Sequence, residues 1–173
     1  MEIFLEIIKY TFPALLMLLL TYLILSNFVE NEEKRRSYEL RKKNRKNAFP
    51  IRLQAFERLS LFLERITPSS LLVRVPSKNL NVKEYQSLLL KAIRDEFEYN
   101  LSQQIYVTEE AWRMVVMAKS ATVSIINKYA TSVDPKGPGV ELSKKILEGT
   151  MDMNVFPTRS AINYLKHEIQ REF

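Results

Sequence analysis

The chain has 173 residues, 46% of them hydrophobic, and a formal net charge of +6. It has no cysteine, which excludes disulfides, thiolate catalysis and cysteine-ligated metals. Its only glycines are Gly137, Gly139 and Gly149, so glycine-rich phosphate loops and dinucleotide-binding fingerprints cannot be built. Low glycine and long segments of helical periodicity predict an all-α protein.

Residues 10–29 form an uncharged stretch with a leucine-rich centre. A helix of about 20 residues is about 30 Å long, which matches the hydrocarbon core of a bilayer. We therefore predict a transmembrane anchor over residues 1–29. A cleaved signal peptide is disfavoured because residues 1–6 are acidic and no Ala-x-Ala site follows. A buried helix of a soluble protein rarely carries so long an apolar run. The residues that we expect to meet the bilayer are Tyr10, Pro13, Leu16, Leu20, Tyr22, Leu25 and Phe28.

Residues 30–47 are highly charged and carry eight basic side chains, and we predict that the anchor continues through this stem as one helix. Basic residues beside a span stay on the cytoplasmic side, so we expect the N-terminus outside and the rest of the chain inside. The basic run either sets topology alone or also holds anionic headgroups. Nucleic-acid binding is disfavoured because no stacking aromatic residues are interleaved. Candidate headgroup contacts are Lys34, Arg35, Arg36, Arg41, Lys42 and Lys43.

Residues 48–173 are long enough for one compact helical domain. Pro50 suits the first turn of a helix, so we predict that a new helix begins there and ends at Thr67–Pro68. Leu61 and Phe62 widen its apolar face, which indicates cover on more than one side. One short helical turn is expected within residues 68–75. The apolar face itself comprises Phe56, Leu59, Leu63 and Ile66.

Helix-capping and helix-breaking residues predict the remaining elements. Asn81 and Glu84 form a capping-box pattern before a helix that ends near residue 101. Residues 105–107 read as an extended link, and Thr108 as the cap of the next helix. Residues 132–139 are the clearest loop and the segment most prone to disorder or proteolysis. A helix over 140–148 should end at Gly149, and the last helix should begin near residue 158.

The polar residues offer little chemistry. His167 lies beside Glu168, but neighbours in sequence point to different helix faces and no nucleophile accompanies them. Asp95 and Glu98 share a face, yet metal binding would need partners from another helix. We therefore assign no catalytic, cofactor-binding or metal-binding residue. Four methionines are expected to fill gaps in the core: Met114, Met117, Met151 and Met153.

Aromatic residues gather in the first half of the domain. Most should be buried, and several exposed together would indicate a protein-binding surface. They are Phe49, Phe56, Phe62, Tyr85, Phe97, Tyr99, Tyr106 and Trp112.

Residues 50–66, PIRLQAFERLSLFLERI, and 96–107, EFEYNLSQQIYV, resemble a family of small bacterial single-span membrane proteins of unknown function. The resemblance covers most of the chain outside residues 132–139. It implies an N-terminal span, a charged stem and a helical domain, but no activity and no functional residues.

The sequence thus favours a bacterial inner-membrane protein whose cytoplasmic helical domain is an interaction or scaffold module rather than an enzyme. Its expected partners are the lipid bilayer and another membrane or envelope protein, with a homo-oligomer as an open alternative. Two other functions stay open: an enzyme acting on lipid or envelope precursors, and a nucleic-acid tether at the membrane.

Overall fold

The computed structural model describes residues 2–151, 153 and 155–171, without the side chains of residues 2–14, 41 and 44–47. It is all-helical over these residues, and its single β-type pairing there is an isolated bridge between Asn81 and Pro138. The chain divides into two units, Met1–Phe49 and Pro50–Phe173. Both units contribute to the first helix.

Helix α1 runs from Glu2 to Ile66 and includes residues 30–47. The prediction that Pro50 begins a new helix is wrong, because the helix continues through this residue. A proline inside a helix removes one backbone donor, at some cost in helix stability. The face that begins six residues later enters the domain core. Phe56, Leu59, Leu63 and Ile66 of that face are all buried.

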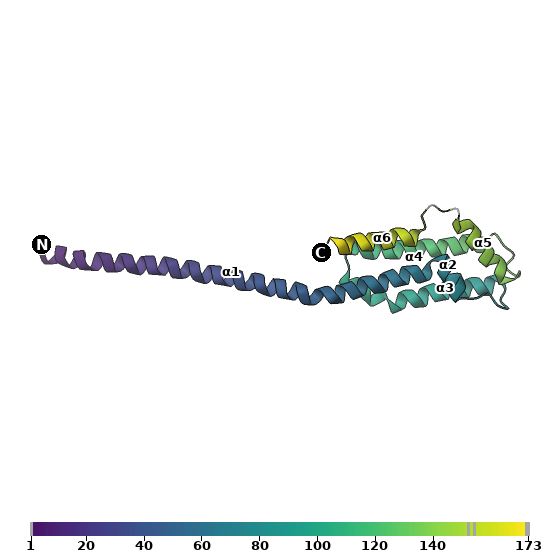
Figure 1. The fold of residues 1–173 in the computed structure, drawn as a ribbon, viewed down its shortest axis with the longest axis horizontal. Helices are drawn as coiled ribbons and strands as arrows, with labels where there is room; N and C mark the ends of the chain where they lie inside the picture. Colours follow the sequence, from purple (N-terminus) through teal and green to yellow (C-terminus); the bar gives the residue numbers. More distant parts are fainter. Residues whose placement is uncertain (1, 152, 154, 172–173) are drawn as a thin grey trace. The chain divides into compact units, whose positions relative to one another are not determined.

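The second unit contains the end of α1 and all later elements, which Figure 1 shows along the chain. Because each later helix buries one face against its neighbours, the second unit has a single core. The core gathers side chains from each α-helix, including Leu71, Leu89, Val115, Ile146 and Leu165. The elements are α2 (Pro68–Arg74), α3 (Val82–Tyr99), the 3₁₀-helix η1 (Leu101–Tyr106), α4 (Glu109–Ala130), α5 (Gly139–Met151) and α6 (Pro157–Gln170).

Two predicted N-caps are confirmed. Asn81 accepts from the Glu84 amide at 2.9 Å, and the Glu84 carboxylate accepts from the Asn81 amide at 3.1 Å. Together these bonds complete the capping box of α3. The Thr108 hydroxyl accepts from the Ala111 amide at 3.2 Å and caps α4. Both caps lie on connections that pack against other elements.

The predicted extended link at residues 105–107 is wrong, because residues 101–106 form η1. Gly149 does not end a helix either, since α5 continues to Met151. A Cβ atom at this position would overlap the ring of Tyr129. Gly149 therefore lets α5 approach α4 closely, a packing role that the sequence pattern does not distinguish from a helix end.

The predicted core needs further corrections. Of the four methionines, only Met114 packs against the core; Met117, Met151 and Met153 are exposed. Leu61 is 56% exposed, so it does not widen the buried face of α1 as predicted, whereas Phe62 is buried. The fully buried Tyr85 donates to the Val75 carbonyl at 2.8 Å. Burial raises the pKa of its phenol, although a hydrogen bond with Ser143 lowers that pKa in part.

Leu61 and Leu63 provide a matched test of the core, because the same substitution is made two residues apart on one helix. Leu63 is fully buried. We expect Leu63→Ala to lower the free energy of unfolding by about 2–5 kcal/mol, since it removes buried methyl groups and leaves a cavity. Leu61→Ala should change that energy by no more than about 0.5 kcal/mol. Chemical denaturation of the full chain measures both, and equal losses would contradict the burial described here.

Candidate functional site

The apolar part of α1 is the first candidate. Leu15–Leu40 is long and apolar enough to cross a membrane, and it is not buried by any other part of the protein that the structure describes. Two polar side chains within it are satisfied locally: the Thr21 hydroxyl donates to the Met17 carbonyl at 2.8 Å, and the Ser26 hydroxyl to the Leu23 carbonyl at 3.1 Å. Such bonds suit a lipid environment, where an unpaired hydroxyl is costly.

The predicted bilayer-facing residues that can be described point outward from this helix. The exposed ones are Leu16, Leu20, Tyr22, Leu25 and Phe28. The side chains of Tyr10 and Pro13 lie outside the described part.

The charged segment that follows the uncharged residues 15–29 is also exposed where its side chains are described. Lys34 pairs with Glu30 at 2.6 Å, and Arg35 pairs with Glu39 at 3.4 Å. Exposed pairs of this kind contribute about 0.3–0.5 kcal/mol each to a helix. Other anions can therefore readily replace the glutamate carboxylates as partners of these basic side chains. Arg36, Lys42 and Lys43 are exposed as well, whereas the side chain of Arg41 lies outside the description.

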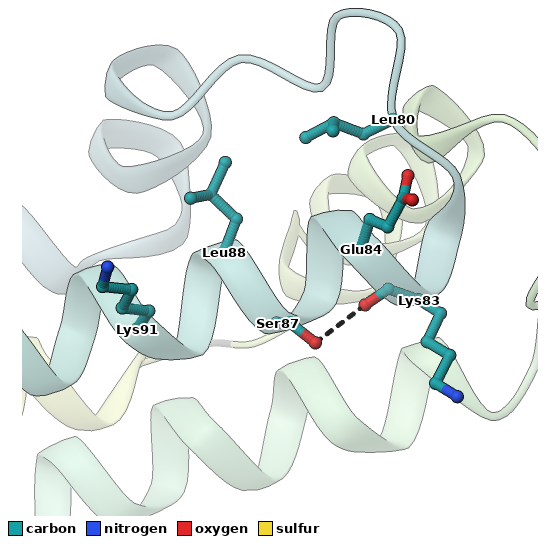
Figure 2. Close-up of a pocket in the computed structure, with 6 residues that line it drawn as sticks. All are labelled: Leu80, Lys83, Glu84, Ser87, Leu88 and Lys91. Carbon is teal, nitrogen blue, oxygen red and sulfur yellow. Dashed lines mark hydrogen bonds between the residues drawn. The ribbon is translucent and has the colours of Figure 1, made fainter.

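A shallow groove on α3 is a concave feature of the second unit. It has a volume of about 470 Å³ and is lined by Leu80, Lys83, Glu84, Ser87, Leu88 and Lys91. Figure 2 shows Lys91 towards one end, Lys83 towards the other, and Ser87 and Leu88 between them. Five of these residues belong to α3, and Leu80 directly precedes the N-cap Asn81. One helix therefore forms most of the wall of this groove. We call it the α3 groove.

The loop at residues 132–139 holds the end of the groove where α3 begins. The Val82 amide donates to the Gly137 carbonyl at 3.0 Å, and the Gly139 amide donates to the Leu80 carbonyl at 2.8 Å. A Cβ atom at Gly139 would lie 3.0 Å from the Leu80 oxygen, so glycine permits this close approach. The segment predicted to be most prone to disorder is thus tied to the start of α3.

The charges of the α3 groove are unequal. The Glu84 carboxylate is occupied by the capping box and lies at the positive end of the helix dipole. The Ser87 hydroxyl donates to the Lys83 carbonyl at 3.0 Å. Neither Lys83 nor Lys91 makes a salt bridge with any residue that the structure describes. Leu88, the apolar lining residue on α3, is 40% exposed. Figure 2 shows Lys91 on the same side of the helix as Leu88, whereas Lys83 extends from the other side.

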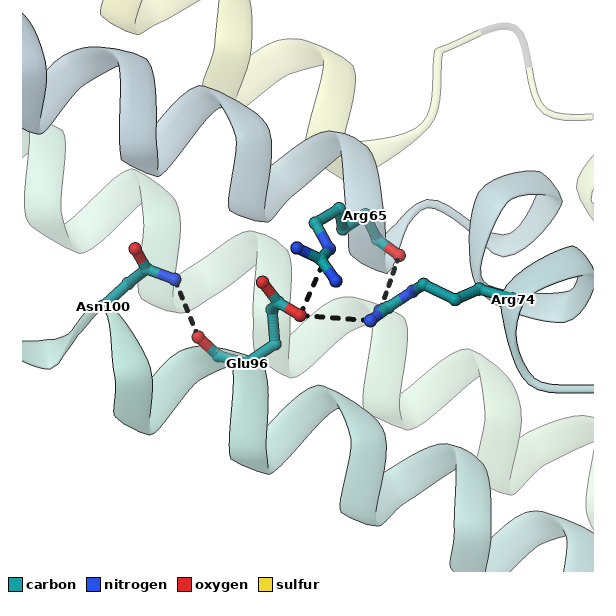
Figure 3. A network of polar contacts seen from close by, with 4 residues as sticks. All are labelled: Arg65, Arg74, Glu96 and Asn100. Atoms are coloured by element: carbon teal, nitrogen blue, oxygen red, sulfur yellow. Dashed lines mark hydrogen bonds and ion pairs between the residues drawn. The ribbon is translucent and has the colours of Figure 1, made fainter.

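Farther along α3, Glu96 joins three helices. Its Oε2 accepts from Arg65 Nε of α1 at 3.2 Å and from the Arg74 guanidinium of α2 at 3.1 Å. Arg74 also donates to the Arg65 carbonyl at 3.4 Å, as Figure 3 shows. The Glu96 side chain is 13% exposed, so water screens this network only in part. It fixes the far end of α3 against α1 and α2.

Beyond this network, apolar and aromatic side chains are exposed over a short segment. Tyr99 and Ile105 are each 72% exposed, and Leu101 and Tyr106 are exposed with them. We call these four residues the η1 surface. Two arginines of α1 border it: Arg58 lies over the Tyr99 ring at 5.8 Å, and Arg52 Nε donates to the Tyr106 carbonyl at 3.1 Å. Exposed aromatic residues together are the arrangement that would indicate a protein-binding surface.

The polar residues considered for catalysis belong to two helices: His167 and Glu168 to α6, and Asp95 and Glu98 to α3. His167 is exposed, whereas Glu168 Oε2 accepts from the Thr108 hydroxyl at 2.8 Å and so supports the α4 cap. Asp95 and Glu98 are both exposed on α3. Among the described residues, no three histidines or carboxylates gather in a way that could hold a metal ion. Of the lining residues of the α3 groove, sequence patterns singled out only Glu84, as part of a cap.

A family model matches residues 2–172 of the chain, which is nearly its full length. The family is described as a family of unknown function. No curated protein and no solved structure matches the chain.

Glu96 and Glu98 give a matched test of the network in Figure 3. We expect Glu96→Gln to lower the free energy of unfolding by about 1–3 kcal/mol, because two partly buried arginines lose their shared carboxylate. Glu98→Gln removes the same charge from an exposed position of the same helix and should change that energy by less than about 0.5 kcal/mol. Urea unfolding of the full chain compares them, and a neutral Glu96→Gln would show that the network contributes nothing.

Proposed function

Since the chain belongs to the DUF7935 family, a family of unknown function, we propose a role from its own residues: a single-pass anchor of the bacterial inner membrane that carries a cytoplasmic interaction module. The observation that carries this proposal is the candidate span Leu15–Leu40, whose uncharged residues 15–29 are covered by no described part of the protein. An apolar surface of that length needs an apolar environment, and a bilayer supplies one. The helical unit that follows has its own core.

The proposed orientation rests on the charges beside the span. Lys34, Arg35 and Arg36 begin a basic run, and the residues before the span carry two acidic groups and one basic group. The positive-inside rule therefore places the N-terminus outside and the helical unit in the cytoplasm. The exposed lysines and arginines of this run would also meet anionic headgroups, at about 1 kcal/mol for each residue near the surface.

The η1 surface supports the interaction role. Tyrosine and arginine are enriched among the residues that dominate binding energy at protein interfaces. Here, Tyr99 and Tyr106 are exposed, and Arg58 and Arg52 border them. A partner that covered this surface would bury two aromatic rings and the Ile105 side chain. The proposed partner is another membrane or envelope protein with an apolar patch at the cytoplasmic face.

The topology is testable because the chain has no cysteine that would compete for a label. We expect Glu2→Cys to react with a membrane-impermeant maleimide in intact spheroplasts, and Phe173→Cys to react only after the membrane is permeabilised. Both variants should react fully in detergent, which is the control for accessible thiols. Labelling of Phe173→Cys in intact spheroplasts would overturn the orientation, and extraction of the chain by alkaline carbonate would overturn the anchor.

The η1 surface is testable by chemical cross-linking of the full chain in native membranes. The double variant Tyr99→Ser/Ile105→Ser should reduce the amount of cross-linked partner at least about tenfold, because interface anchors contribute about 2 kcal/mol or more each. Met117→Ser, at an exposed position of α4, should leave the amount unchanged. Unfolding curves should show all variants folded. An unchanged cross-linking pattern in the double variant would exclude this surface as the binding site.

A further inference from the structure

One side of α1 carries a hollow that fits a facing helix, and we propose that two copies of the chain pair in parallel along it. The pairing rests on the proposed membrane anchor and gives that anchor a partner on a surface separate from the η1 surface. The hollow has a volume of about 350 Å³. Its lining residues are Tyr22, Leu25, Ser26, Val29, Glu30 and Glu33.

The hollow belongs to a longer row of residues on the same side of α1. Residues spaced alternately three and four positions apart share one side of a helix, and this is the spacing at which two helices pack along a common seam. Every residue of the row is exposed, so no described part of the chain covers it. We call this row the α1 seam. It comprises Tyr22, Ser26, Val29, Glu33, Arg36 and Leu40.

In the uncharged part of the seam, shape favours another helix. Helices in a membrane associate through close packing, and a small residue at the contact lets their backbones approach. Ser26 is the small residue between Tyr22 and Val29, and its hydroxyl donates to the Leu23 carbonyl at 3.1 Å. It therefore leaves a recess without an unpaired donor. In a parallel pair, Tyr22 of the facing copy would lie beside this recess and fill it.

The charged part of the seam argues for a copy of the same chain. Glu33 and Arg36 make no salt bridge with any residue that the structure describes, although other charges of this segment pair within the helix. Two copies that share one topology run parallel and are related by a two-fold axis. Glu33 of each copy would lie about 4.5 Å along the axis from Arg36 of the other, within reach of an ion pair. The resulting cluster of two carboxylates and two guanidinium groups is neutral.

Leu40 extends the seam beyond the uncharged residues. It is 56% exposed and lies about 16 Å past Val29 along α1, in the charged segment. A single exposed leucine is ordinary on a protein surface. This one, however, shares a side of the helix with Ser26 and Glu33, where the hydrocarbon core of a bilayer would not cover it. In a parallel pair, the Leu40 side chains of the two copies would cover each other.

Disulfide cross-linking of the full chain in isolated native membranes tests the seam, because the chain has no cysteine of its own. On mild oxidation, Ser26→Cys and Val29→Cys should each give a product of twice the chain mass. Ile24→Cys and Asn31→Cys are matched controls, two residues away on the opposite side of α1. The seam positions should react at least about tenfold faster, because a disulfide needs Cα atoms within about 7 Å. Equal rates on the two sides, or no product at positions 26 and 29, would overturn the proposal.

A charge exchange tests whether the facing surface is the same seam. In the Ser26→Cys chain, Arg36→Glu should lower the cross-linking rate at least about fivefold, because four carboxylates would then meet. Arg35→Glu makes the same change in charge on another side of the helix and should leave the rate within about twofold. The exchange Glu33→Arg/Arg36→Glu restores two opposite pairs and should recover most of the rate. Equal losses in the two single variants, or no recovery in the exchange, would overturn the ion pairs that make a second copy the partner.

The mass of the cross-linked product identifies the occupant of the seam. A product of two chains supports the proposal, whereas a product with another protein overturns it. A seam covered only by lipid gives no product at positions 26 and 29 and overturns it as well. Alkaline carbonate extraction of the same membranes reports the anchor separately. A chain that resists extraction but does not cross-link refutes the pairing alone, and an extracted chain refutes the proposed anchor.

Discussion

Burial of the last turns of α1 in the domain core is the interaction on which the rest of the structure depends. Leu59, Phe62, Leu63 and Ile66 are all fully buried, and they belong to the same helix as the candidate span Leu15–Leu40. The last turns of α1 are therefore part of the second unit. The segment that follows Pro50 is itself a core element, so the domain cannot fold completely without the end of α1.

Helix α3 is held in place by the same core. Its buried face, with Tyr85, Leu89 and Ile93, packs inward and leaves the opposite face in solvent. The capping box and the loop of residues 132–139 hold its start, and the Glu96 network holds its other half. A helix fixed near both ends presents its exposed side chains in a defined arrangement. The α3 groove depends on that arrangement, as does the η1 surface that follows the helix.

Local signals predicted much of this fold. The capping pattern at Asn81 and Glu84 and the cap at Thr108 act within four residues, so sequence spacing describes them fully. The buried face at the end of α1 followed from helical periodicity for the same reason. Pro50 shows where such signals fail. Its local preference for a first turn did not start a new helix, because α1 continues through it.

The candidate surfaces depend on contacts between distant segments, which one sequence does not reveal. Leu61 and Leu63 have the same side chain, but the neighbouring elements bury only Leu63. Gly149 has the composition of a helix end, yet the ring of Tyr129 on another helix is the reason for its small size. The sequence by itself determined the apolar stretch, its basic flank and the helical class, because each follows from the order of residues along the chain. Tertiary structure alone decided which lysines stay unpaired and which aromatic residues stay exposed, since packing between helices sets both.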